Sequence, residues 1–131
     1  MTERTATRPG TATPLLALRV AAAATVLVLA WQFVTAGQLL GGAASDDLHA
    51  VGAIALHVVA LAAAAAALWL RQRTAGPLWP SVVAVAVFAA SFVQAALGSS
   101  HQMAAHVPGA LVLTVGSVWV LAWSLSRHPV G

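Results

Sequence analysis

The chain contains no cysteine and few charged residues. Without thiols it can form neither a disulfide nor a thiolate metal centre, and it lacks the Cys-x-x-Cys-His attachment of a c-type haem. Charged residues make up 7% of the 131 residues, whereas a soluble domain carries about 25%. Hydrophobic residues make up 60%. The composition therefore excludes an ordinary soluble domain, and any bound prosthetic group would be held non-covalently.

The sequence contains four apolar runs of about 20 residues, and none of these runs contains an acidic residue. At a rise of about 1.5 Å per residue, 20 helical residues cover roughly 30 Å, the thickness of a bilayer core. The sequence therefore predicts an all-α protein, an integral membrane antiparallel four-helix bundle. The predicted spans are residues 15–37, 47–70, 78–98 and 101–126.

Residues near the ends of the spans predict where the spans begin and whether the first span is retained. Residues 1–14 are rich in threonine, proline, glycine and arginine, which predicts a disordered tail before a transmembrane domain over residues 15–127. Ser99 and Gln102 fit a capping box, which predicts the start of the fourth span. The Val-Thr-Ala at 34–36 resembles a signal-peptide cleavage site, but the apolar run before it exceeds the usual core of about 7–15 residues. We therefore expect the first span to be retained.

The loop charges predict the orientation. Asp46 and Asp47 lie between the first and second spans, whereas the arginines lie on the other side. The six arginines, which are all of the cationic residues, are Arg4, Arg8, Arg19, Arg71, Arg73 and Arg127. The positive-inside rule then places both termini in the cytoplasm, in a bacterial inner membrane. The net charge of +3 is a topology signal, and we expect the lipid bilayer, not nucleic acid, as the partner.

The second and fourth spans both begin with a His-x-x-Gly-Ala pattern. His49 is followed by Gly52, and His106 is followed by Gly109. Residues three apart lie on one helix face, so each imidazole lies beside a bare patch of backbone. The spans before these two patterns also align with each other. The sequence therefore predicts two repeated helical hairpins, related by an axis along the membrane normal.

The two paired histidines lie at similar depth near the outer face, where both can ligate one metal axially. Gly52 and Gly109 would leave room for a porphyrin, because close backbone approach needs a missing side chain. Gln32 and Gln94 lie in the outer parts of the first and third spans. An amide is costly in lipid, so we expect both to point inward, toward a neighbouring helix or a bound group. The pattern favours haem b as the cofactor.

His57 lies about 12 Å deeper on the same helix as the first histidine of the pair. The repeat places Thr114 opposite it, not another histidine. We expect a neutral His57 that is hydrogen-bonded inside the bundle to Gln32, Gln94 or Thr114. The alternative is a proton-relay or redox role beside a bound group, since ionisable residues inside a membrane are often functional.

Four short segments carry a family resemblance: WQFVTAG at 31–37, LHAVG at 48–52, QAALG at 94–98 and AHVP at 105–108. They resemble an uncharacterised bacterial four-helix membrane family, the domain of unknown function numbered 6220. That resemblance runs through all four predicted spans. It implies a fold and no activity.

The chain also resembles, more distantly, one four-helix half of haem A synthase. In that half, a carboxylate-x-x-His motif and a second histidine flank a haem at the outer face. The resemblance matches Asp46 to the carboxylate, His49 and His106 to the ligands, and Gln94 with Leu97-Gly98 to a helix-3 segment. It implies haem binding. Ala50 stands where an arginine commonly follows the first histidine and the second half is missing, so synthase activity is not implied.

Three interpretations stay open. The first is a small b-type haem protein that transfers electrons or handles haem near the outer face, with a membrane redox partner or a larger complex. The second is a non-catalytic scaffold or accessory subunit with structural histidines. The third is an outer-face copper or zinc site of His49, His101 and His106, with Met103 or Asp46 as a further ligand. Whether the protein is an enzyme is left open; a protein without enzymatic activity is favoured, and no catalytic residue is assigned. The remaining histidine, His128, is expected to be solvated in the cytoplasm.

Overall fold

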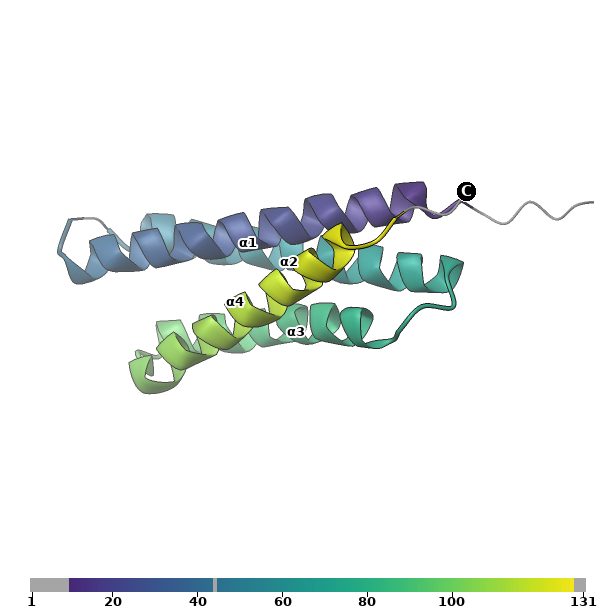
Figure 1. The fold of residues 1–131 in the computed structure, drawn as a ribbon. Coiled ribbons are helices and arrows are strands. Elements are labelled where there is room, and N and C mark those ends of the chain that lie inside the picture. Colours follow the sequence, from purple (N-terminus) through teal and green to yellow (C-terminus); the bar gives the residue numbers. More distant parts are fainter. Residues whose placement is uncertain (1–9, 44, 129–131) are drawn as a thin grey trace, which may run out of the picture.

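The computed structural model describes residues 10–43 and 45–128, which form four helices and no strand (Figure 1). The helices are α1 (Ala12–Leu40), α2 (Asp47–Arg73), α3 (Trp79–Ser99) and α4 (Met103–Leu125). Each of the four is long and apolar enough to cross a membrane. The predicted all-α four-helix membrane bundle is confirmed, and the protein is a multi-pass membrane protein.

The helices form a closed ring around one axis. α1 and α3 each pack against both α2 and α4, whereas the diagonal pairs, α1 with α3 and α2 with α4, do not pack together. The α1–α2 and α3–α4 connections lie at one end, which we call the distal end; the described chain ends lie at the other, the terminal end (Figure 1). The α1–α2 and α3–α4 hairpins spread apart toward the distal end. The two histidine-bearing helices, α2 and α4, are thus diagonal partners.

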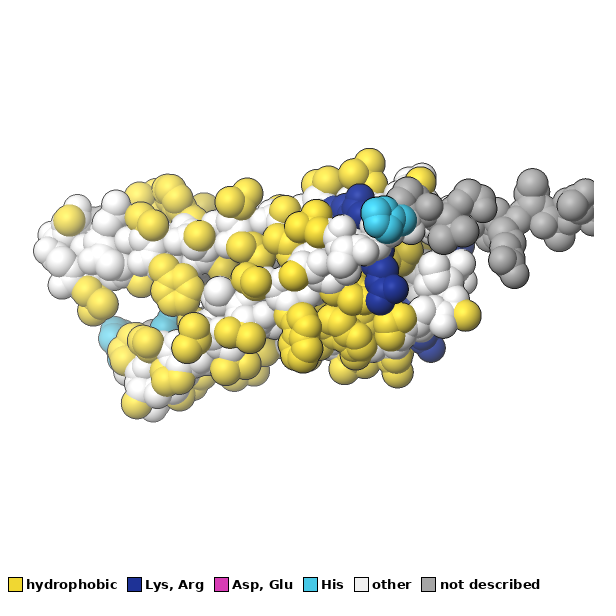
Figure 2. Space-filling view, in the orientation of Figure 1, with side chains coloured by type: hydrophobic (Ala, Val, Ile, Leu, Met, Phe, Trp, Pro, Cys, Tyr) yellow, Lys and Arg dark blue, Asp and Glu magenta, His cyan; other side chains and the backbone are white. Residues whose placement is uncertain are grey.

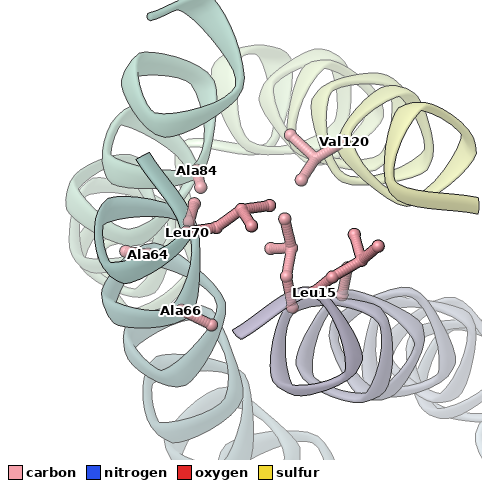
Figure 3. Close-up of a cluster of buried hydrophobic side chains, with 9 residues drawn as sticks. Leu15, Ala64, Ala66, Leu70, Ala84 and Val120 are labelled. Atoms are coloured by element: carbon pink, nitrogen blue, oxygen red, sulfur yellow. The ribbon is translucent and has the colours of Figure 1, made fainter. Parts of the chain in front are cut away.

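The hydrophobic core lies in the terminal half of the bundle and is built mostly from alanine and leucine side chains (Figure 3). Its buried residues are Leu15, Leu18, Ala22, Ala64, Ala66, Ala67, Leu70, Ala84 and Val120. A second cluster continues toward the middle with Leu29, Leu56, Ala60, Val87 and Leu113. Alanines allow close backbone approach, and such packing drives helix association where lipid removes the hydrophobic driving force.

Arg19 joins the first helix to the end of the last. Its Nε donates to the carbonyl of Ser124 at 3.1 Å, and its Nη2 donates to the carbonyl of Arg127. Carbonyls in the last turn of a helix have no partner within that helix. The guanidinium therefore satisfies the end of α4 and closes the ring between α1 and α4.

The first helix begins earlier than predicted. α1 starts at Ala12, so residues 12–14 belong to the helix and not to the expected tail. Pro14 lies in the first turn, where its missing amide hydrogen has no helical acceptor to lose. The rest of the predicted tail, residues 1–9, lies outside the described residues.

The same backbone turn ends α1 and α3. Gly42 and His101 both adopt the left-handed conformation, with φ of +68° and +58°. In each turn the amide of that residue bonds to the carbonyl three residues back, and the next amide bonds to the carbonyl five residues back. This pattern is the Schellman motif. The two hairpins therefore share their turn geometry, as a repeat requires.

The turn at His101 also explains why the predicted start of the last span was wrong. A left-handed residue cannot continue a right-handed helix, so α4 begins at Met103 and Gln102 takes the N-cap position. Ser99 belongs to the end of α3, where its hydroxyl donates to the carbonyl of Ala96 at 3.1 Å. The predicted capping box therefore does not form.

We expect His101→Gly to raise the free energy of unfolding and Gly42→Ala to lower it, each by about 1 kcal/mol. The reason is that a left-handed conformation costs an L residue roughly 1–2 kcal/mol and costs glycine almost nothing. Thermal unfolding in detergent micelles measures both effects. His101→Ala keeps the conformational strain and should match the unsubstituted protein; a gain equal to that of His101→Gly would contradict this account.

A candidate metal centre at the distal end

His49 of α2 and His106 of α4 face each other between the two hairpins. Their ring centroids lie 6.3 Å apart and their planes are inclined by 69°. Both side chains are half-buried. Figure 2 shows the distal end hollowed between the hairpins, with histidine side chains at the edge of the hollow. The structure therefore brings together the histidine pair that the sequence singled out.

The ring of His106 is held by the preceding helix through Nδ1. This nitrogen lies 3.0 Å from the backbone carbonyl oxygen of Gln94. A carbonyl oxygen only accepts hydrogen bonds, so Nδ1 must carry the proton and Nε2 must carry the lone pair. The ring also packs closely on α3, because a Cβ at Gly98 would lie 3.1 Å from its Cε1.

The ring of His49 is held in the corresponding way by α1. Its Nδ1 lies 3.0 Å from the hydroxyl oxygen of Thr35. The Thr35 hydroxyl lies 3.1 Å from the carbonyls of Trp31 and Gln32, which accept its single hydrogen. The hydroxyl oxygen then accepts from Nδ1, so His49 also keeps the lone pair on Nε2.

Both Nε2 atoms are open. Within residues 10–43 and 45–128, the hydrogen bonds of His49 and His106 involve Nδ1 and leave Nε2 without a partner. Neither Nε2 is fully buried, because the buried side-chain atoms without a partner are Gln94 Oε1 and Trp123 Nε1. Two accessible imidazole lone pairs therefore remain at the distal end, each on a ring that is fixed through its other nitrogen.

The ring separation suits linear coordination. Two metal–nitrogen bonds of about 2.0–2.1 Å, with about 1.1 Å from each nitrogen to its ring centre, give centroids about 6.2–6.4 Å apart, whereas a tetrahedral angle gives about 5.2 Å. The observed 6.3 Å fits the linear case. Axial ligands can rotate about their metal bonds, so the inclination of 69° is compatible with it. By ring separation, the pair matches two imidazoles bound on opposite sides of one ion, as at the axial positions of haem iron or on a two-coordinate copper(I) ion.

The glycines of the His-x-x-Gly pattern do not line an open slot. A Cβ at Gly52 would lie 2.7 Å from Oε1 of Gln32, and one at Gly109 would overlap the side-chain nitrogen of Gln94. Each His-x-x-Gly face turns toward the preceding helix, where the imidazole finds its Nδ1 acceptor. The space expected to admit a porphyrin is filled by a glutamine side chain over both glycines.

Gln32 and Gln94 therefore play matching parts in the two hairpins. Each packs its side chain on the glycine of the next helix. The Gln94 carbonyl accepts from His106 directly, whereas the Gln32 carbonyl accepts from the Thr35 hydroxyl that holds His49. Both side chains are half-buried and lie between helices, as expected from the cost of an amide in lipid. The repeated contacts support the hairpin repeat.

His57 occupies a separate position between α2 and α3. Its Nδ1 lies 2.7 Å from the hydroxyl oxygen of Ser91, which donates to the carbonyl of Phe88 at 2.6 Å. Its ring stacks on Phe92 with centroids 4.1 Å apart. The expected hydrogen bond inside the bundle is present, but the expected partners were wrong: Ser91 takes the place of the two glutamines and of Thr114, whose hydroxyl donates to its own helix.

The other candidate ligands do not join the pair. Among the described residues, no three histidine, aspartate or glutamate side chains converge in a way that could hold a metal ion. His101 is exposed in the turn before α4, Asp46 and Met103 are exposed, and His128 is exposed at the terminal end. The structure therefore assembles two nitrogen ligands at the distal end.

Three supporting residues were not assigned these roles from the sequence: Thr35, Ser91 and Gly98. The signal for the first two was a hydroxyl inside an apolar run, which must find a partner in hydrocarbon. That rule does not say which histidine lies opposite. The contact of Gly98 with an imidazole depends on how α3 and α4 approach each other, which the sequence pattern does not state.

Gly52→Ala and Gly109→Ala should each lower the free energy of unfolding by about 1–3 kcal/mol, because the added methyl overpacks against a glutamine side chain. Gly37→Ala is the matched control, since nothing lies within 4 Å of a Cβ at that position. Thermal unfolding in micelles measures all three. Gln94→Ala added to Gly109→Ala should recover part of the loss; a Gly109→Ala protein as stable as Gly37→Ala would contradict the contact.

No protein-family model matches the chain, and neither does any curated protein or solved structure. The resemblances stated from the sequence therefore remain predictions. What the protein does must be inferred from the chemistry of the distal end itself.

Proposed function

We propose that this protein is a small b-type haem protein of the membrane, in which His49 and His106 ligate the haem iron near the distal end. The observation that supports it best is the 6.3 Å separation of the two rings, each fixed through Nδ1. Metal-ligating histidines usually donate their other ring N–H to a carbonyl or similar acceptor, which fixes the ring and raises ligand basicity. When bound, haem supplies one-electron redox chemistry.

The neighbouring residues support a site that is completed by a bound group. Gln94 Oε1 is buried and has no hydrogen-bond partner among the described residues. A buried acceptor without a partner is rare in native proteins, and a bound water, ion or ligand is one of the groups that can satisfy it. This Oε1 atom belongs to the same residue whose backbone carbonyl holds His106. In the hollow between the hairpins, His49 and His106 would hold the group, with the Gln32 and Gln94 side chains beside it. An electron-transfer role implies a redox partner in the membrane.

The second candidate is a non-catalytic scaffold or accessory subunit. The observation that favours it is that His49, His57 and His106 all have hydrogen-bond partners inside the bundle, while glutamines fill the space over both glycines. On this interpretation the histidines satisfy the bundle's own polar groups. The two candidates differ in whether the free Nε2 atoms ever bind a metal.

The purified protein in micelles should bind one equivalent of ferric haem and develop the Soret and visible bands of a six-coordinate low-spin centre. His49→Ala and His106→Ala should each weaken binding at least about ten-fold and lose that spectrum, since even removal of a supporting residue costs about 10–100-fold at metal sites. His101→Ala is the matched control and should bind like the unsubstituted protein.

An absorption titration with haem and a parallel titration with copper(I) separate the candidates. Copper(I) binding that depends on the same two histidines, without haem binding, would replace haem by copper as the cofactor. Absence of binding in both titrations would leave the scaffold as the function.

We further propose that the protein lies in a bacterial inner membrane with both termini in the cytoplasm, which puts the distal end at the outer face. The support is charge: Arg19, Arg71, Arg73 and Arg127 belong to the terminal half, whereas the aspartates precede or begin α2 at the distal end.

Reporter fusions at Gly42 and at Arg73 should report opposite compartments, with Gly42 outside and Arg73 inside. The positive-inside rule gives the reason, because basic loops are retained in the cytoplasm. Alkaline phosphatase and fluorescent-protein fusions read the two sides. If both fusions report the same compartment, the proposed topology is wrong. If Gly42 is inside and Arg73 outside, the orientation is the reverse of the one proposed.

A further inference from the structure

An apolar groove runs along α1 and α2 in the terminal half of the bundle, apart from the histidine pair. Its volume is about 480 Å³. On α1 it is lined by residues between Thr13 and Ala24, mostly alanine, leucine and valine, and on α2 by Val59 and Ala62. This volume falls in the range of about 300–1,000 Å³ that is typical of small-molecule sites.

The length of the groove matches one leaflet of a bilayer. Thr13 and Ala24 are 11 residues apart on α1, and at about 1.5 Å per residue they are roughly 16 Å apart along the helix. The hydrocarbon core is about 30 Å thick, so one leaflet is about 15 Å deep. A single acyl chain that runs from the interface to the bilayer centre therefore has the length of this groove.

The volume of the groove favours an acyl chain over a second protein helix. A 16 Å length of helix about 10 Å across occupies roughly 1,300 Å³. That is more than twice the 480 Å³ of the groove. A second copy of this chain would rest on the groove without filling it, whereas an acyl chain can enter it.

A free cation stands at the end of the groove that reaches the membrane surface. Arg73 is the last residue of α2 and follows Ala62 and Val59 by 11 and 14 residues, close to three and four full turns, so it lies on the same helix face. Thr13, in the first turn of the antiparallel α1, is at the same end. The Arg73 side chain is exposed and forms no hydrogen bond within the described residues.

The other arginines nearby are already engaged. Arg71 donates to the carbonyl of Gly76, Arg19 donates to the end of α4, and Arg127 lies over the ring of Trp123. The acidic residues of the described chain, Asp46 and Asp47, are both at the distal end. The uncompensated charge of Arg73 therefore favours an anion at the mouth of the groove.

We propose that this groove binds one acyl chain of an anionic phospholipid whose phosphate is held by Arg73, with the Thr13 hydroxyl as a second donor. The binding is independent of the proposed haem. The fit of the chain to the groove selects a lipid, and the charge of Arg73 selects an anionic headgroup. The protein would carry this lipid as a bound component in the leaflet of the terminal end.

Native mass spectrometry of the full chain, released from micelles with equal amounts of phosphatidylglycerol and phosphatidylcholine, tests the proposal. The unsubstituted protein should retain one phosphatidylglycerol in preference to phosphatidylcholine. Arg73→Gln should reduce that preference about five-fold, the effect of about 1 kcal/mol per basic side chain near the surface. Arg127→Gln removes the same charge from the end of α4, a helix that does not line the groove, and should leave the preference unchanged.

Ala62→Phe tests the groove itself, because it fills the groove from an exposed position without entering the core. It should reduce retention of both lipids. Equal retention of the two lipids, equal effects of Arg73→Gln and Arg127→Gln, or a retained dimer that Ala62→Phe dissociates would each overturn the proposal. If Ala62→Phe does not fold, the comparison of the two arginine variants decides alone.

Discussion

The structure depends on one constraint: a polar group inside hydrocarbon must find its partner within the bundle, because no water is there to replace it. Hydroxyls of Thr25, Thr114 and Ser117 bond back to their own helices. The histidines of α2 and α4 cannot do this. His49 and His106 bond to the preceding helix, and His57 bonds to the following one. That need orients the rings of His49 and His106. At the distal end it leaves the two Nε2 atoms and Gln94 Oε1 without a partner among the described residues, and these atoms are available to a ligand.

Because the hairpin is repeated, the same requirement for hydrogen-bond partners fixes two histidines, and the two meet at the distal end. In each hairpin the first helix fixes the histidine of the second, through the Thr35 hydroxyl for His49 and through the Gln94 carbonyl for His106. In each, a glutamine side chain also packs over the glycine of the second helix. Because α2 and α4 are diagonal in the ring, the two fixed rings approach each other and do not lie on separate sides. The terminal half carries the alanine-rich core and the contacts of Arg19. Stability and the candidate chemistry are therefore placed at opposite ends of the molecule.

The fold could be predicted because two features of the sequence extend over its whole length. The apolar runs match the thickness of a bilayer, and the arginines are confined to alternate ends of these runs. The convergence of His49 and His106 followed from matched depth and spacing. The role of the glycines did not follow, since a bare backbone patch can admit a cofactor or a neighbouring side chain equally well. The Ser91 partner of His57 and the left-handed turn at His101 depend on helix rotation and loop closure, which a one-dimensional pattern does not contain.

The most direct measurement of the central claim is nitrogen NMR of the protein labelled with ¹⁵N-histidine, recorded in micelles before and after one equivalent of haem. The account predicts that His49 and His106 both carry the proton on Nδ1 and an unprotonated Nε2, in accordance with their hydrogen bonds. Both Nε2 signals should then change together on addition of haem, while the His57 signals keep their tautomer. A proton on Nε2 of either ring, or a response confined to one ring, would contradict the account.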